Sequence, residues 1–371
     1  MPIASVVMIS GNAPPVVCGI GDYTTRLSGE LRSLGIPITV WSREQSGVVQ
    51  SETVRTPAPR LDRAGITAFI TRFEAERPAV LHLQYESDSY DDNGLALLRF
   101  AVAARKIGAS LVTTFHALDG PRSWGRGHRL ALIAGIIGSR DIVICSKRQR
   151  DVLSKLPGIG AKTHLIPVGN TIPVTGERAV KTASEPLRLV YFGFVWRGRN
   201  LETCVRAVAA VNEHTPATLA IAGGIKDGSY RREIELFAES LGVAAKVTFT
   251  DDLPAAALSS ILTNADIALL PFATGVSTGR STLAAVLEHG LPTVTMATPA
   301  NLIPEFRDGE NMLYVSPADT DGFIRETTRL ATDTTLRQSL AANALTLARH
   351  FSWQEIARTT ANLPSYRGFG C

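Results

Sequence analysis

Two arginines in the second half of the sequence follow predicted strands, a position where anionic ligands commonly bind. Arg199 lies in WRGRN (196–200), a few residues after Gly193, and a guanidinium group can bind two oxygen atoms at once. Arg280 lies in GVSTGRST (275–282), just before a predicted helix that begins at about Ser281. The first turn of a helix offers free N–H groups and a positive dipole end, so this segment predicts an anion site that includes Ser277, Thr278, Gly279, Ser281 and Thr282.

Each of these features also has a purely structural explanation. A solvated arginine before a helix would account for Arg199. Ordinary N-capping by serine or threonine would account for the residues around Arg280, and it is compatible with anion binding.

In the first half, a glycine-rich loop and two further strand ends carry candidate residues. The loop contains Gly19 and Gly21, which let a ligand approach the backbone before a predicted helix, although a tight turn without a ligand remains an alternative. A dinucleotide fingerprint is not indicated, because its third glycine position holds Thr24 and the second strand ends in WSR (41–43). His116 and Glu86 each follow a strand. A structural histidine and a packing role for Glu86 are the alternatives.

Composition limits the classes of protein that remain. The net charge of +4 is too small to indicate a nucleic-acid surface, so we expect no nucleic-acid partner. The four cysteines form no CxxC pair, which predicts neither a zinc site nor a disulfide framework. The aspartates of 88–92 and 319–321 are explained by solvated loops, so we predict no metal and no cofactor.

A cytoplasmic location follows from the same features. The apolar run 130–138 is too short to span a bilayer. The basic segment Pro121–Arg129 has two interpretations. The favoured one is a flexible loop beside the substrate-binding site, and the other is peripheral contact with anionic lipid at the inner membrane.

Strand and helix patterns alternate along the whole chain and predict two Rossmann-like domains with parallel sheets that face a central cleft. The first covers 1–170 and the second 171–351, with the boundary in the linker-like stretch 169–186. A final helix that begins near Ser352 carries the stripe Phe351, Trp353 and Ile356, and we expect residues 352–371 to pack back on the first domain. The predicted strands are 3–10, 36–41, 80–84, 111–115, 142–145, 164–168, 187–192, 218–222, 247–250, 267–270, 293–296 and 312–315.

Several segments, taken in order, resemble the retaining glycosyltransferases of the family numbered four, which are sucrose-synthase-like and have the GT-B fold. The similarity begins with GIGDYTTRLSGELRSLGIPITVWS and His116 in TTFHALDG. It continues through IPVGN, FGFVWRGRNLE, IAGG, ADIALLPF, LEHGLPTV, DGENMLYVSPAD and FSWQEIA. The ordered set spans nearly the whole chain.

The resemblance implies roles for particular residues. Arg199 matches the basic residue that binds the diphosphate of the donor, and His116 matches the residue that contacts the donor sugar. For a transferase of this kind, we expect the acceptor-binding residues to be Asp22, Tyr23, Tyr85 and Glu86. The family usually has a second basic residue where this chain has Phe194, and Arg197 or Arg280 is expected to replace it. The family's two glutamates, eight positions apart, correspond to Ser277 and Ala285, which indicates a divergent subgroup. Glu288, one helical turn beyond Ala285, is the candidate substitute.

The resemblance thus implies a metal-independent transferase that moves a hexose or similar sugar from a nucleotide sugar to a saccharide, glycolipid or metabolite acceptor with retention of configuration. A UDP-sugar is the favoured donor, and GDP- and ADP-sugars remain open. Two alternatives remain. A GT-B sugar-nucleotide epimerase would need paired acid and base carboxylates, and a catalytically silent sugar-nucleotide-binding protein would explain the missing glutamates. The sequence does not set the oligomeric state.

Overall fold

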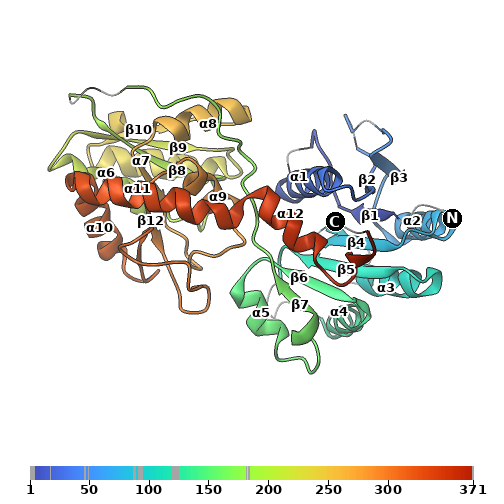
Figure 1. The fold of residues 1–371 in the computed structure, drawn as a ribbon. Helices are drawn as coiled ribbons and strands as arrows, with labels where there is room; N and C mark the ends of the chain where they lie inside the picture. The colour runs from blue at the N-terminus through green and yellow to red at the C-terminus, as the bar shows by residue number, and fades with distance from the viewer. Residues whose placement is uncertain are drawn as a thin grey trace. The chain divides into compact units, whose positions relative to one another are not determined.

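The computed structural model describes residues 5–16, 18–45, 47–48, 50–86, 89–90, 95–118, 125–180, 182 and 184–369, without the side chains of Arg126 and His128. The chain divides into two compact units (Figure 1). Unit 1 comprises Met1–Thr171 and Trp353–Cys371, and unit 2 comprises Ile172–Ser352. Each unit is described by itself.

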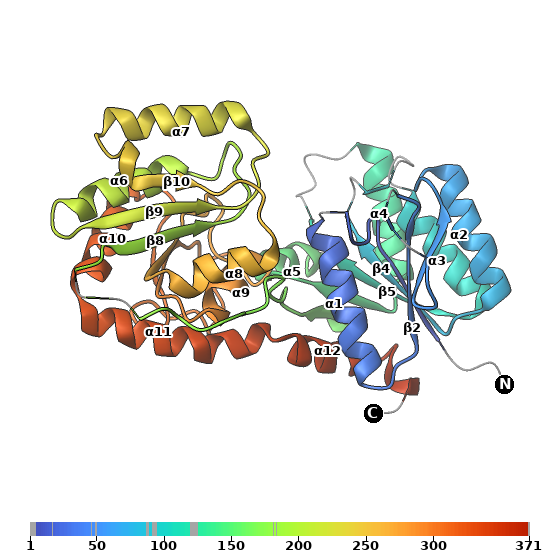
Figure 2. The ribbon, with the colours of Figure 1, turned by 90° about the horizontal axis from the view of Figure 1, so that it is seen from above.

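Unit 1 is built on a parallel sheet in the order β3-β2-β1-β4-β5-β6-β7. Helices α1 and α12 cover one face through Leu27, Leu31 and Ile356, and α2, α3 and α4 cover the other through Phe69, Phe100 and Leu132 (Figure 2). The strands are β1 (Val6–Ile9), β2 (Ile38–Arg43), β3 (Val54–Ala58), β4 (Val80–Tyr85), β5 (Ser110–Phe115), β6 (Asp141–Ile144) and β7 (Thr163–Leu165). The helices are α1 (Gly19–Ser33), α2 (Arg63–Glu76), α3 (Ala96–Ile107), α4 (Arg126–Gly138), α5 (Lys147–Leu153) and α12 (Trp353–Ala361).

Unit 2 repeats this architecture with a parallel sheet in the order β10-β9-β8-β11-β12-β13. Val205, Ile234 and Phe323 bring α6, α7 and α10 against one face, while α8, α9 and α11 pack on the other. The strands are β8 (Leu187–Phe192), β9 (Ala217–Ala222), β10 (Val247–Phe249), β11 (Ile267–Leu270), β12 (Thr293–Met296) and β13 (Leu313–Val315). The helices are α6 (Leu201–Asn212), α7 (Gly228–Ser240), α8 (Ala255–Asn264), α9 (Ser281–Glu288), α10 (Thr320–Thr332) and α11 (Thr334–Ala348).

The prediction of two Rossmann-like parallel sheets is confirmed, with one strand added to it. The sequence patterns did not indicate β3, whose residues 54–57 are only half-buried and include Pro57. Proline is tolerated there because β3 pairs only with β2 and forms an edge of the sheet. None of the helices in the described residues is both long and apolar enough to cross a membrane.

The C-terminal segment belongs to unit 1 and is held there by polar contacts as well as by apolar packing. The indole Nε1 of Trp353 donates to the carbonyl of Asn170 at 2.6 Å, and its ring lies 5.3 Å from that of Tyr23. Further along, the hydroxyl of Tyr366 lies 2.7 Å from Nδ1 of His82, and the backbone N–H of Ser365 donates to the buried carboxylate of Asp141 at 2.9 Å. These contacts join the last residues to β4 and β6.

His82 makes the stability of unit 1 dependent on pH. Its imidazole is fully buried between Tyr366 and Thr114, and burial, reinforced by nearby His116, lowers its pKa from 6.5 to about 3. Between these two values the unfolded chain binds a proton that the folded chain does not, so stability is lost as the pH falls below about 6.5. We expect lowering the pH from 6.5 to 4.5 to cost about 2 kcal/mol through this residue.

The measurement is urea unfolding at several pH values, followed by tryptophan fluorescence. His82→Gln should make the pH dependence shallower, with buried His116, whose pKa is also lowered, to about 4, supplying part of what remains. His214→Gln, which changes an exposed histidine, should leave the pH dependence as in the wild type. Equal slopes for wild type and His82→Gln would contradict this prediction.

Candidate functional site

In unit 2, the carboxyl ends of β8 and β9 approach each other through glycines. Gly193 follows β8 with φ of +146°, and its N–H donates to the carbonyl of Ala222 at 2.9 Å. Gly223 has φ of +136°, and a Cβ at that position would lie 2.5 Å from the carbonyl oxygen of Gly193. The backbone therefore requires glycine here. Ligands of parallel sheets usually bind at these carboxyl ends of the strands.

Arg199 is held close to the carboxyl ends of β8 and β9. Its guanidinium carbon lies 4.9 Å from the centre of the Trp196 ring, and the next residue, Asn200, adopts the left-handed conformation and donates to the carbonyl of Pro271 at 3.1 Å. The Nε atom of Arg199 is buried and has no hydrogen-bond partner among the residues that the structure describes. A buried donor without an acceptor is costly, so its position favours a ligand that supplies one.

Arg280 is held from three sides at the start of α9. Its guanidinium carbon lies 4.0 Å from the centre of the Phe272 ring, Nη2 donates to Oγ1 of Thr274 at 2.7 Å, and Nε donates to the carbonyl of Gly275 at 3.3 Å. Burial, and secondly the positive charge of Arg199, lower its pKa to about 10. The guanidinium groups of Arg199 and Arg280 thus repel each other, and no ion pair to either is formed within the described ranges. An anion between them would relieve this repulsion.

The N-terminus of α9 adds to the positive potential. The side chain of its N-cap residue, Arg280, makes no hydrogen bond to the helix start. The backbone N–H of Leu283 donates to the carbonyl of Arg280 at 3.0 Å, and the earlier N–H groups of a helix are typically left for another acceptor. The helix start lies beside the end of β8, because a Cβ on Gly193 would be 3.5 Å from Cγ2 of Thr282. Ser281 and Thr282 are half-buried here, Gly279 is exposed, and Ser277 and Thr278 are buried. The structure thus brings Gly193, Arg199, Arg280 and the α9 start together.

Two other predicted residues, Arg197 and Glu288, and the position Ala285, where the family has a glutamate, are not part of this cluster. Arg197 forms a bidentate pair with Glu233, with both N–O distances 2.7 Å, so the charge of its guanidinium is already matched. Glu288 is the last residue of α9, roughly 10 Å along the helix axis from Ser281 at a rise of about 1.5 Å per residue. Ala285 is fully buried. A glutamate at position 285 of this chain would therefore have to be buried, which is costly without a partner.

In unit 1, His116 lies directly after β5 and is held by two neighbours. Its Nε2 lies 2.8 Å from Oε1 of Gln84, and its ring meets Tyr23 edge-on with centroids 4.9 Å apart. Burial lowers the pKa of His116 to about 4, so the imidazole is neutral near pH 7. If Nε2 donates to Gln84, then Nδ1 is left as an acceptor. A neutral ring in this setting can hydrogen-bond a sugar hydroxyl, but it cannot stabilise negative charge as a cation would.

Gln84 is a residue that the sequence reasoning missed. It is the buried last residue of the predicted strand 80–84, and its Nε2 has no hydrogen-bond partner among the described residues. A glutamine inside such a strand was the available signal.

Two tyrosines expected to contact the acceptor are core residues. Tyr85 is only 2% exposed and stacks on Tyr90 at 5.4 Å between ring centres. Side chains alternate along β4, so Tyr85 shares a face with Leu81 and Leu83 and points into the core. Tyr23 is 1% exposed, so its ring supports His116 and Trp353 and is not open to an acceptor. Both expectations are therefore corrected to packing roles.

The glycine-rich loop leads into α1 as expected. Gly19 is exposed with open space around it, whereas a Cβ on Gly21 would lie 3.1 Å from the carbonyl oxygen of Asn12. Asp22 is half-buried in the first turn of α1, and burial raises its pKa despite the nearby charge of Arg26. Glu86 follows β4 and is half-buried. Gly19, Asp22 and Glu86 remain predicted ligand contacts.

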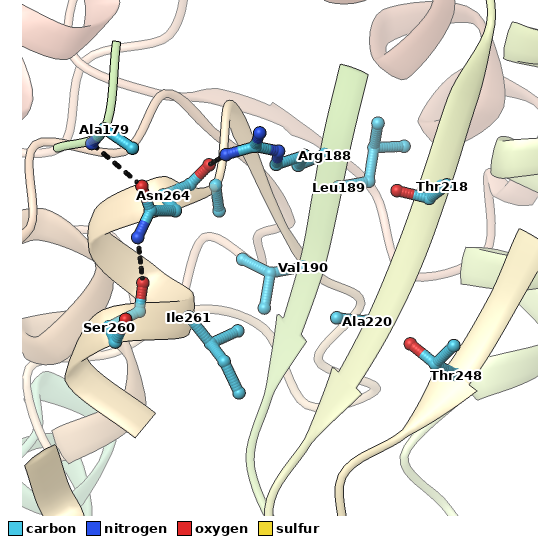
Figure 3. Close-up of a pocket in the computed structure, with 11 residues that line it drawn as sticks. Ala179, Arg188, Leu189, Val190, Thr218, Ala220, Thr248, Ser260, Ile261 and Asn264 are labelled. Carbon is cyan, nitrogen blue, oxygen red and sulfur yellow. Dashed lines mark hydrogen bonds between the residues drawn. The ribbon is translucent and has the colours of Figure 1, made fainter. Parts of the chain in front are cut away.

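A separate cavity of about 490 Å³ lies between the sheet of unit 2 and α8 (Figure 3). Its walls come from the first four residues of β8 and β9 and include Val190, Ala220 and Ile261. The charge of Arg188 at its rim is paired with Glu185. The cavity is thus lined mainly by uncharged groups near the opposite ends of these strands, and we do not assign it to the reaction. No cluster of three or more potential metal ligands occurs among the residues the structure describes.

Comparisons with known proteins agree with this architecture. Residues 17–170 match the family model Glycosyltransferase Family 4, and residues 186–333 match the model Glycosyl transferases group 1. A D-inositol 3-phosphate glycosyltransferase from Actinosynnema mirum is 32% identical over 196 residues, which cover 50% of this chain and 45% of that protein. The protein of the same name from Salinispora arenicola is 27% identical over 335 residues, or 80% of this chain and 71% of that one. This chain's match therefore spans less than half of the first relative.

Solved structures show the same fold. Sucrose-phosphate synthase from Thermosynechococcus elongatus has a TM-score of 0.77 at 18% identity and covers 98% of each chain. Anabaena Alr3699/HepE, solved in complex with UDP and glucose, has a TM-score of 0.70 at 14% identity and covers 96% of this chain and 98% of that one. The two-sheet architecture is thus the GT-B fold. Unit 1 thus contains a segment that matches Glycosyltransferase Family 4, and unit 2 contains a segment that matches Glycosyl transferases group 1.

Proposed function

We propose that this protein transfers a sugar from a UDP-sugar to a saccharide, glycolipid or small-metabolite hydroxyl with retention of configuration, without a metal ion. The observation that carries the proposal is that two guanidinium groups, those of Arg199 and Arg280, lie close enough to repel each other beside the start of α9. The N-cap side chain of this helix makes no capping hydrogen bond. Two cations and a helix N-terminus suit a diphosphate, which carries two or more negative charges on closely spaced oxygen atoms. The UDP in the Anabaena HepE structure supports uracil as the base of the donor.

The proposed chemistry uses the departing diphosphate as the base. The bond between the anomeric carbon and the diphosphate oxygen breaks, the acceptor oxygen bonds to the same face of that carbon, and the acceptor's proton passes to a diphosphate oxygen. Arg199 and Arg280 stabilise the negative charge that develops on the leaving group, and their fixed positions reduce the cost of reorganisation. Neutral His116 holds a hydroxyl of the transferred sugar.

This route needs no protein carboxylate, which fits the residues found at the α9 start. The positions of the family's two glutamates hold Ser277 and Ala285, both buried. An epimerase or an inverting transferase would need a placed acid or base there, and neither of these two side chains can act as one at neutral pH. A catalytically silent binding protein is disfavoured because both family matches and both curated relatives are transferases.

Calorimetric titration with UDP tests the donor site. We expect Arg199→Ala to weaken binding by about 1.5 to 3 kcal/mol, the scale of a hydrogen bond to a charged group. Arg197→Ala is the companion variant, because it removes an arginine two residues away whose charge Glu233 already matches. It should lose much less affinity. Titrations with GDP and ADP determine the preferred base.

The proposal fails if UDP, GDP and ADP all leave the wild-type protein without a binding signal. The assignment of Arg199 fails if Arg199→Ala binds as tightly as the wild type. A larger loss in Arg197→Ala than in Arg199→Ala would move the diphosphate to the other arginine.

A further inference from the structure

The described part of unit 1 concentrates its exposed large apolar side chains on two neighbouring helices. They are Leu95 (46% exposed), Val102 (60%), Leu130 (69%) and Ile137 (64%). Leu95 is the N-cap of α3, Val102 is within α3, and Leu130 and Ile137 belong to α4. We call the outer surface formed by these residues the α3/α4 face. Isolated exposed apolar residues need no explanation, but a cluster on one surface does.

The two helices bring these side chains into parallel stripes. Leu95 and Val102 are seven residues apart, as are Leu130 and Ile137, so each pair lies two helical turns apart on one side of its helix. The helices pack closely, because a Cβ on Gly135 would lie 2.3 Å from Cγ of Leu97 and one on Gly138 would lie 2.7 Å from Cβ of Ala101. Both helices already bury their inner sides in the core. The exposed stripes are therefore additional to what the fold needs.

Basic residues lie at both ends of the apolar stripes, and neither helix contains an acidic residue. The α3 sequence ALLRFAVAARKI ends in Arg105 and Lys106, and the α4 sequence RGHRLALIAGIIG begins with Arg126 and includes Arg129. Exposed Arg140 follows α4. The two helices run parallel, since each connects adjacent parallel strands, so Arg140 lies at the same end as Arg105. Lys106 pairs with Glu74 of α2 at 2.8 Å, which leaves the positive charge in excess.

This combination distinguishes between two kinds of partner. A symmetric contact between two copies of the face would place basic ends against basic ends, with no carboxylate on either helix to pair with them. A bilayer that contains anionic lipid offers an apolar interior for the stripes and negative headgroups for the arginines. We propose that the α3/α4 face binds the surface of an anionic membrane. The proposal depends on unit 1 alone and does not rest on the proposed function.

Vesicle flotation tests the proposal directly. The wild-type protein is mixed with vesicles of phosphatidylglycerol and phosphatidylcholine in equal amounts, or of phosphatidylcholine alone, at low and high salt. We expect binding to the anionic vesicles that weakens at high salt, and at least about tenfold weaker binding to phosphatidylcholine, because each basic residue near the surface contributes about 1 kcal/mol.

Two double variants identify the face. Leu130→Glu with Ile137→Glu should reduce binding to the anionic vesicles by at least about tenfold, since it removes apolar insertion and adds negative charge. The matched control, Leu236→Glu with Leu241→Glu, changes two exposed leucines of unit 2 by the same charge and should bind like the wild type. Arg105→Gln with Arg140→Gln should weaken binding and reduce its salt dependence. An unchanged melting temperature verifies that each variant is folded.

The proposal is overturned if the wild type does not float with the anionic vesicles, or if it binds phosphatidylcholine equally well. It is also overturned if the Leu130 and Ile137 variant binds no more weakly than the Leu236 and Leu241 control. Sedimentation that shows a dimer lost only in the Leu130 and Ile137 variant would assign the face to a second copy instead.

Discussion

Replacing Arg280 by alanine should lower kcat/KM by about 100- to 1000-fold, or roughly 2.7 to 4 kcal/mol, the scale of removing one fixed donor that stabilises transition-state charge. The guanidinium is already stacked on Phe272 and bonded to Thr274 and Gly275, so it loses little freedom when the diphosphate departs. The effect should appear mainly in kcat, because negative charge on the leaving group grows as its bond breaks.

His116→Ala should lower kcat/KM by a similar factor, but for a different physical reason. Its neutral imidazole is fixed by Gln84 and Tyr23, and positioning the sugar correctly is as important as stabilising the leaving group. UDP binding should be nearly unchanged in this variant, because the proposed UDP contacts are in unit 2. That separates its behaviour from that of Arg199→Ala.

Donor turnover, followed as release of UDP from the preferred UDP-sugar, measures both effects. Arg280→Lys keeps the charge but loses the planar group, so it should fall between the wild type and Arg280→Ala. Arg206→Ala, which removes an arginine that stacks on Phe237, is a suitable control and should be fully active. Near-normal turnover in both Arg280→Ala and His116→Ala would contradict the proposed roles, and an inverted anomeric product by NMR would contradict the front-face route.

The parallel sheets could be predicted because their strands are buried on both faces and read as continuous apolar runs. The bounds of β8, β11 and β12 agree with the sequence prediction for this reason. The edge strand β3 was not predicted, because it is half-buried and contains Pro57, so its sequence resembles that of a loop.

The sequence names the residues of the candidate site by type and position, but it does not show the contacts that decide what each residue can do. The sequence places Tyr85 after His82 and Gln84, yet only the register of β4 shows that the tyrosine points into the core. Arg197 and Arg199 look equivalent in WRGRN. The difference is Glu233 on α7, which pairs with one and not the other, and such a long-range contact leaves no local signal. The stacking partners Trp196 and Phe272 were missed for the same reason.

Truncation after His350 should destabilise both units by several kcal/mol. It removes Phe351, which is fully buried in the core of unit 2 beside Leu283 and Leu347, and it removes Trp353, Ile356 and Tyr366 from the core of unit 1. Burial of each such side chain contributes about 1.5 to 3 kcal/mol. The truncation also strips His82 and Asp141 of their partners Tyr366 and Ser365, and buried polar groups left unpaired add a further cost.

Single substitutions show how much of this loss of stability belongs to each unit. Phe351→Ala should lower the melting temperature of unit 2, and Ile356→Ala that of unit 1, each with a loss of about 2 to 5 kcal/mol. Removing only residues 370–371 is the matched control, because every contact named above is retained. Differential scanning calorimetry with and without UDP separates the transitions, since a ligand held by unit 2 stabilises that unit in proportion to its occupancy. A chain truncated after His350 that melts like the control would show that the C-terminal segment does not stabilise either core.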